Sequence, residues 1–153
     1  MTRAELLRAL RAERHAIVAS VSADGGPQAA VVGVVVSDEL EIFFDTLDVT
    51  HKAVNLRARP RAAVVIGSVA AGAQVTVQIE GVADEPRGAD LERLKALYFE
   101  RFMDGPARQA WRGIIYVRLR LTWVRFSDYG ANPPRIVELD AAALEGLTSS
   151  SEA

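Results

Sequence analysis

The sequence contains six apolar runs of strand length, and the first three follow one another with only short turns between them. Strands joined by such turns pair antiparallel, because a parallel pair needs a crossover of a dozen or more residues. The expected strands are 15–22, 28–37, 40–46, 61–69, 74–84 and 113–127, and the expected helices are 2–14, 49–59 and 85–103. This order predicts a mainly β fold, a small antiparallel barrel with peripheral helices, because a closed sheet leaves no long exposed edge.

Length and charge limit the classes to which the chain can belong. Its 153 residues suit one core, and the formal net charge of −2 gives no basic field for nucleic acid. The chain has no cysteine, its N-terminal apolar residues are broken by charges, and no apolar run could cross a bilayer. We expect a cytoplasmic protein without a nucleic-acid or membrane partner. Residues 1–140 would form one domain, and the tail 141–153 would fray from residue 145.

One expected strand needs cover on both of its faces. The run "QAAVVGVVVS" is apolar at nearly every position, whereas the run "QVTVQIEGVAD" alternates apolar and polar residues. A strand of the first kind is buried on both sides. The barrel interior covers one side, so a helix or another subunit must cover the other. The sequence therefore favours a homodimer.

The segment "THK" stands at the start of the expected second helix, in a chain that has only two lysines. A helix N-terminus offers free N–H groups and the positive end of the helix dipole. Together with the hydroxyls of Thr46 and Thr50, the side chain of His51 and the ammonium of Lys52, it could hold a phosphate. An alternative needs no ligand, because Asp48 or Thr50 could simply cap the helix and Lys52 could be a solvated charge.

Several short motifs in a fixed order resemble the FMN-binding split-barrel family, the pyridoxamine 5'-phosphate oxidase-like proteins. They are "FFDT", "THK", "NL", "RP" and "IEG", and the resemblance covers residues 16–84 well and the last long strand more weakly. It implies a six-stranded antiparallel Greek-key split β-barrel. It also implies a homodimer that binds FMN between its subunits.

The resemblance assigns roles to twelve residues. Thr50, His51 and Lys52 would grip the flavin phosphate, with Thr46 and Asp45 nearby. The strand around Val31, Val32 and Gly33 would lie along the isoalloxazine edge. Either Gln74 or Thr76 would contact the ligand. Trp123 and Arg125 match the aromatic and basic residues of the family's last strand and would reach the flavin of the partner subunit.

Four of the assignments outside the helix start have a structural alternative. Gly33 could mark a bulge. Gln74 and Thr76 could lie on the solvent face of an amphipathic strand. Trp123 shares the apolar face of its strand with Leu121 by strict alternation, which also suits a core tryptophan.

The region after residue 123 lacks the Arg-x-His pair with which true pyridoxamine 5'-phosphate oxidases hold their substrate. We therefore expect an FMN-dependent oxidoreductase with another small-molecule substrate. It would have no catalytic side chain and no metal ligand, because the flavin carries the electrons. One alternative is a reductase using reduced deazaflavin, for which Arg3, Arg8, Arg11 and Arg14 could bind a polyglutamyl tail. The other is a non-catalytic flavin- or haem-binding protein.

Overall fold

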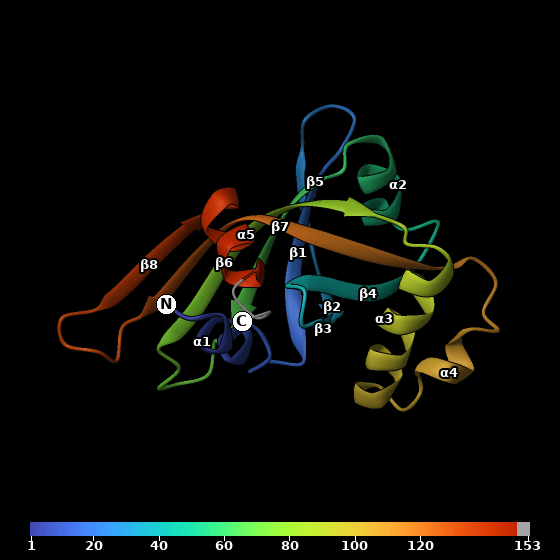
Figure 1. Cartoon of the computed structure of the whole chain (residues 1–153). Helices are drawn as coiled ribbons and strands as arrows, with labels where there is room; N and C mark the ends of the chain where they lie inside the picture. Colours follow the sequence, from blue (N-terminus) through green and yellow to red (C-terminus); the bar gives the residue numbers. More distant parts are fainter. Residues whose placement is uncertain (150–153) are drawn as a thin grey trace.

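The computed structural model describes residues 1–149 and shows one sheet surrounded by helices (Figure 1). The elements are α1 (Arg3–Leu10), β1 (His15–Val21), β2 (Pro27–Gly33), β3 (Val35–Val36), β4 (Glu41–Leu47), α2 (His51–Ala58), β5 (Arg61–Gly67), β6 (Val75–Asp84), α3 (Gly88–Arg101), α4 (Gly105–Arg108), β7 (Ile114–Asp128), β8 (Arg135–Asp140) and α5 (Ala141–Ser149). None of the helices within these residues has the length and apolar character needed to span a bilayer.

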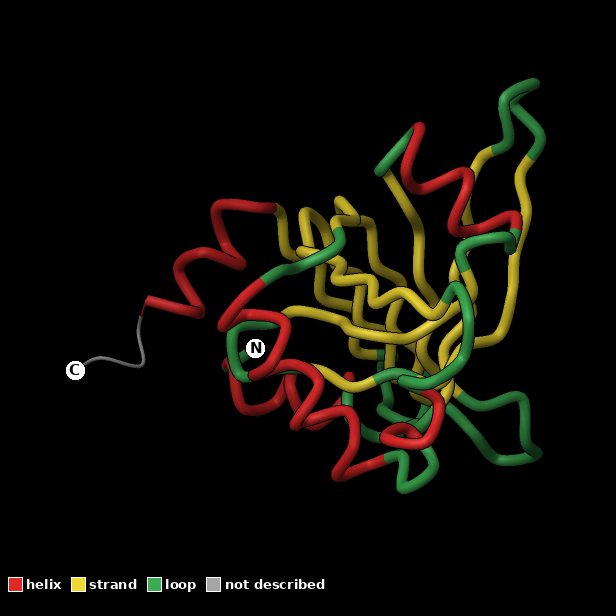
Figure 2. Tube along the Cα trace, turned by 90° about the vertical axis from the view of Figure 1, so that its right-hand side faces the viewer, coloured by secondary structure: helices red, strands yellow, loops and turns green. Residues whose placement is uncertain are grey.

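The sheet has eight antiparallel strands in the order β2-β1-β5-β6-β7-β4-β3, with β8 paired to β7. It curls around a single large core, as Figure 2 shows from the side. The predicted class, a mainly β antiparallel split barrel with peripheral helices, is therefore confirmed. The chain adds two strands to the six expected, because the long apolar run breaks at Val34 to start β3 and the sequence after β7 returns as β8.

Helices α1 and α2 lie at opposite ends of the curled sheet (Figure 1). At one end, Leu6 and Leu10 of α1 are fully buried in the core, and Thr2 closes a capping box with Glu5. At the other end, α2 buries Ala53 and Leu56. The first helix stops earlier than the expected residue 14.

A β-bulge in β7 changes which of its side chains face the core. Glu80 of β6 is opposite Trp123 and Gly81 is opposite Leu121, so Thr122 has no partner in β6. The extra residue reverses the alternation. Beyond it, Val124 and Phe126 are buried, and Trp123 turns to the outer face. The expectation that Trp123 continues the apolar face of Leu121 is therefore wrong.

Helix α3 covers the outer face of β3 and β4. Val35 and Phe43 form a second core with Leu94, Tyr98 and Phe102 of this helix and its C-cap. Strand β4 is thus buried on both faces, between the barrel interior and α3.

Arg118 of β7 is buried beneath the same helix. It pairs with Glu41, Asp84 and Asp90 at 3.1, 2.6 and 3.2 Å. Its exposed fraction is 5%. A charge at this depth is tolerated because all three partners are carboxylates.

The outer face of β2, β1 and β5 has no such cover from residues 1–149. Val31, Ile17 and Val65 lie side by side across the three strands, and all three are exposed, Val31 to 69%. The adjacent Val32 points the other way and is buried in the core. Only Val31 can therefore take part in an interface, whereas Val32 belongs to the fold.

The end of the described chain is more regular than the sequence suggests. Helix α5 runs through Ser149, so the fraying expected from residue 145 is wrong for the described part. Leu144 anchors the helix in the main core. The remaining residues of the expected tail, 150–153, lie outside the described residues.

Candidate functional site

The N-terminus of α2 borders a pocket between this helix and strands β1 and β2. The pocket has a volume of about 400 Å³ and is lined by Val18, Ser20, Gln28, Ala29, Ala30, Thr50, His51 and Lys52. The helix begins at His51, so the backbone amides of His51 and Lys52 belong to its first turn. Such amides have no partner inside a helix and favour an anion.

Thr50 holds this helix start in place. Its hydroxyl donates to the Leu47 carbonyl at 2.8 Å and accepts from the Ala53 amide at 3.4 Å. Thr46 lies beside it, with 3.2 Å between the two hydroxyl oxygens. The Thr50 oxygen therefore caps the helix, as the capping alternative expects, and its hydrogen is committed to the Leu47 carbonyl.

Lys52 is the cation of the pocket. Burial lowers the pKa of its ammonium below the usual value. Within residues 1–149 no carboxylate forms an ion pair with it, whereas the other lysine, Lys95, pairs with Glu92. A partly desolvated ammonium without a counter-ion is a suitable partner for an anionic group.

Asn55 organises the polar wall of the pocket, although the sequence analysis gave this residue of the "NL" motif no role. Its side-chain Nδ2 donates to the Ser20 hydroxyl at 3.0 Å and to Oε1 of the Gln28 side chain at 2.8 Å. The Gln28 amide nitrogen is therefore the group that lies 3.3 Å from Nδ1 of His51. This relay makes Nδ1 the acceptor and places the hydrogen of a neutral His51 on Nε2. The sequence signal for this residue was the "NL" motif of the family resemblance.

A comparison with sequence families now fits this arrangement. The profile described as pyridoxamine 5'-phosphate oxidase matches residues 2–128. The chain belongs to this family. No match was found among curated proteins.

Solved structures share the fold at low identity. A haem-binding protein from Mycobacterium smegmatis aligns with a TM-score of 0.80 and 22% identity over 95% of this chain. The present chain spans only 61% of that protein's length. HutZ, a haem storage protein from Vibrio cholerae, aligns with a TM-score of 0.68 and 19% identity over 79% of this chain and 91% of its own length. An FMN-binding protein from Nostoc punctiforme, related to pyridoxamine 5'-phosphate oxidase, aligns with a TM-score of 0.66 and 14% identity. The alignment covers 90% of this chain and 84% of that protein.

The remaining residues that the family resemblance singles out lie away from this pocket. The ring of Phe102 packs closely against Gly33. A Cβ at this position would lie 2.7 Å from Cζ of Phe102, too close for any other residue. The chain's own aromatic side chain therefore explains this glycine. Asp45 points to the α3 side, where it accepts from Tyr98 and Arg108 at 2.9 and 2.8 Å.

The four residues expected on the later strands are not brought to the pocket within one chain. Thr76 pairs with Gly67 at the end of β5 remote from α2, and Gln74 precedes it. Trp123 lies in the same row of the sheet as the pocket residue Ala29. Four strand spacings separate them, about 19 Å along the curved sheet. Arg125 pairs with Glu138 of β8 at 3.2 Å.

The arginines of the N-terminal segment are largely used by the fold. Arg3 donates to the Asp38 carbonyl, and Arg11 donates to the Val36 carbonyl at 2.8 Å and pairs with Asp38. Arg14 donates to the Arg101 carbonyl at 2.8 Å. These contacts leave little of this family member's basic surface for a polyanionic tail.

Proposed function

We propose that this protein is a homodimeric flavoprotein that binds FMN with its phosphate at the N-terminus of α2. The observation that carries the proposal is the unpaired, partly desolvated ammonium of Lys52 beside two first-turn amides in an open pocket. A phosphate supplies the missing negative charge and accepts hydrogen bonds from these groups. His51 adds the Nε2 hydrogen that its contact with Gln28 leaves on the outer side of the ring.

The proposed dimer accounts for two features that one chain leaves open. The exposed row of Val31, Ile17 and Val65 would be covered by the second copy. Gln74, Thr76, Trp123 and Arg125 would then approach the pocket of the partner subunit rather than that of their own chain. An interface through this apolar row would bring the cofactor site and the later strands together.

FMN would supply the electron chemistry, and the chain would bind and orient it. The pocket holds no side chain that we assign as a general acid or base. The segment after Trp123 contains no histidine, so vitamin B6 phosphate oxidation is not proposed. We propose an oxidoreductase acting on another small molecule.

Haem binding is the second candidate, because two structural neighbours are a haem-binding and a haem storage protein. His51 is the histidine of the pocket and would have to be the axial ligand. Ligation of the haem iron through Nε2 requires that Nε2 carries no hydrogen. The hydrogen of the neutral ring is then on Nδ1, which must donate it to an acceptor. The Asn55–Gln28 relay instead presents an amide hydrogen to Nδ1. This geometry favours FMN over haem.

An absorption spectrum of the purified protein, with mass spectrometry of the released ligand, tests the cofactor. Flavin bands and a mass of FMN support the proposal, whereas a Soret band or a deazaflavin mass contradicts it. Oxidation of a reduced nicotinamide by the flavin-loaded protein would then separate an enzyme from a binding protein.

Replacing Lys52 tests the phosphate site itself. Lys52→Ala should weaken FMN binding by about 1.5–3 kcal/mol, because one charge-assisted hydrogen bond is lost. Binding of riboflavin, which lacks the phosphate, should not change. Lys95→Ala is the matched control, since Lys95 is the other lysine and lies on α3. Equal FMN affinity in Lys52→Ala and the wild type would refute this site.

A further inference from the structure

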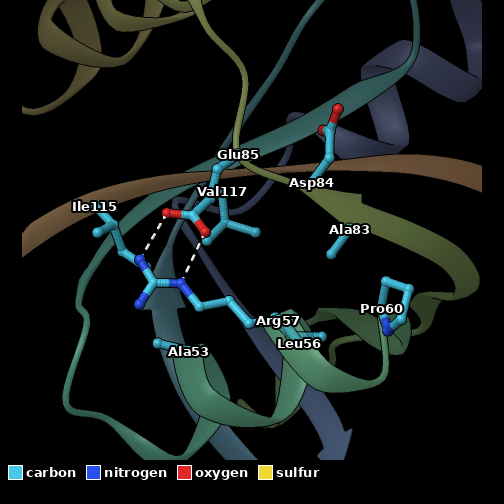
Figure 3. A pocket seen from close by; sticks show the side chains of 9 residues that line it. All are labelled: Ala53, Leu56, Arg57, Pro60, Ala83, Asp84, Glu85, Ile115 and Val117. Atoms are coloured by element: carbon cyan, nitrogen blue, oxygen red, sulfur yellow. Dashed lines mark hydrogen bonds and ion pairs between the residues drawn. The ribbon is translucent and has the colours of Figure 1, made fainter.

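A second pocket lies on a different side of α2, between this helix and the ends of β6 and β7 (Figure 3). Its volume is about 230 Å³, and it is lined by Ala53, Leu56, Arg57, Pro60, Ala83, Asp84, Glu85, Ile115 and Val117. Among these described residues, none also lines the pocket of Lys52. Most of the lining is apolar, and the polar groups are confined to the mouth.

An ion pair spans the mouth of this second pocket. Nε and Nη2 of Arg57 donate to the two carboxylate oxygens of Glu85 at 2.8 and 2.9 Å (Figure 3). The pair uses one edge of the guanidinium. Nη1 donates to none of the described residues, so the end of the guanidinium formed by Nη1 and the second hydrogen of Nη2 is unused.

Every carboxylate oxygen of the pocket lining accepts a hydrogen bond, whereas part of the Arg57 guanidinium donates none to the described residues. Both oxygens of Glu85 accept from Arg57, and both oxygens of Asp84 accept from Arg118, with Arg120 as a further donor. The unused donors of Arg57 favour a ligand that brings acceptors. A planar carboxylate matches the free end of a guanidinium in a bidentate geometry.

The size of the cavity limits the apolar part of such a ligand. A dry cavity of about 150 Å³ lined by aliphatic side chains holds benzene. The present volume of about 230 Å³ therefore accommodates a substituted ring. Leu56, Ile115 and Val117 provide the aliphatic walls that would contact it.

We propose that this pocket binds a small aromatic monocarboxylate, with the ring among Leu56, Ile115 and Val117 and the carboxylate on Arg57. The site does not depend on the flavin proposal, because it shares no lining residue with the pocket of Lys52. A ligand of this size binds with a Kd of about 1 mM.

The test is a titration of the full-length protein with benzoate, followed by the methyl resonances of Leu56, Ile115 and Val117. We expect saturable shifts at these methyl groups. Benzyl alcohol, which keeps the ring and lacks the charge, should bind at least tenfold more weakly. Benzylamine, which reverses the charge, should not bind.

Two substitutions and a control separate the charge from the cavity. Arg57→Gln should weaken benzoate at least tenfold and leave benzyl alcohol unchanged, whereas Ala53→Leu should fill the cavity and weaken both. Arg59→Gln is the matched control, because Arg59 donates to the Val21 carbonyl and does not line the pocket. Benzoate shifts that persist in Arg57→Gln, that match those of benzylamine, or that are absent from the wild type would overturn the proposal.

Discussion

The barrel carries two apolar outer faces, and the described part of the chain covers only one of them. On β3 and β4, Val35 and Phe43 are buried by α3. On β1 and β2, the equally apolar Ile17 and Val31 are exposed, although the sequence of this region looks no more suited to solvent. Folding alone thus satisfies the first face, and the proposed homodimer would cover the second.

The two faces also differ in their charged residues. The covered face contains Arg118, which ties together carboxylates from β4, β6 and α3. The row formed by Val31, Ile17 and Val65 has no charged member. Charges on the covered face fix α3 in one position, whereas an uncharged row can be buried against a second copy without leaving a charge unpaired.

The largest effect is expected from breaking the covered face. Arg118→Ala leaves Glu41 buried without this partner, and we expect a loss of about 3–5 kcal/mol in the free energy of unfolding. Urea denaturation measures it. Arg120→Ala is the control, because Arg120 is exposed and its pair with Asp84 contributes less than about 1 kcal/mol. Equal losses in the two variants would contradict the role of the buried network.

The same network should respond to acid. Hydrogen bonds from Arg118 lower the pKa of the Asp84 and Asp90 carboxyls. For Glu41 burial acts upward, but Arg93, Ser37 and Arg118 hold its pKa below the usual value. Carboxyls with lowered pKa stabilise the fold above about pH 4, and this stability is lost as the pH falls through their folded pKa values. The difference in the free energy of unfolding between the wild type and Arg118→Ala should therefore shrink as the pH falls, because protonation of these carboxyls removes the same interactions. Urea denaturation at a series of pH values measures it.

A charge on the uncovered face should act on assembly instead of folding. Val31→Asp should raise the dimer dissociation constant about 100-fold, or about 2.8 kcal/mol, while the unfolding of the monomer changes little. Sedimentation velocity across a concentration series measures the shift. Val69→Asp is the control, because Val69 is fully exposed in the loop between β5 and β6. A wild type that sediments as a monomer at micromolar concentration would contradict the dimer.

Trp123 tests whether the later strands serve the partner subunit. It lies outside the core, so Trp123→Ala should cost less than the 3–5 kcal/mol or so of a core aromatic. Flavin affinity should fall by about 1–2 kcal/mol, a factor of five to thirty. Thermal unfolding and flavin titration of the same preparation separate the effects. A flavin loss that only follows unfolding would make Trp123 a structural residue.

The sequence predicts the parts of this fold that depend on local pattern. Alternation and turn residues locate the six main strands, and the Thr-His-Lys start and Pro60 locate α2. The capping role of Thr50 also follows from its position before the helix. These features depend on residues close together in the chain, so one sequence is sufficient.

Features that depend on distant residues could not be predicted. At Thr122, strand β7 has one residue more than the facing part of β6, and this bulge turns Trp123 to the outer face. It depends on how the two strands pair, which the sequence of either strand alone does not show. Gly33 is explained by Phe102, which approaches from another element. Arg118 gave no sign of burial, because its carboxylate partners come from three other elements.

The smallest effect concerns Arg125, whose pair with Glu138 links β7 to β8 on the outer face. The pair is partly exposed, so Arg125→Gln should change the free energy of unfolding by less than about 1 kcal/mol. The effect on flavin binding decides its role. If Arg125 serves the partner's flavin, Glu138 competes for the same guanidinium, and Glu138→Gln should raise flavin affinity while Arg125→Gln lowers it. If the pair only joins two strands, both substitutions weaken β8 equally and leave flavin affinity unchanged. Flavin titrations of the two variants and of the double variant distinguish these outcomes, because only a shared ligand gives single changes of opposite sign.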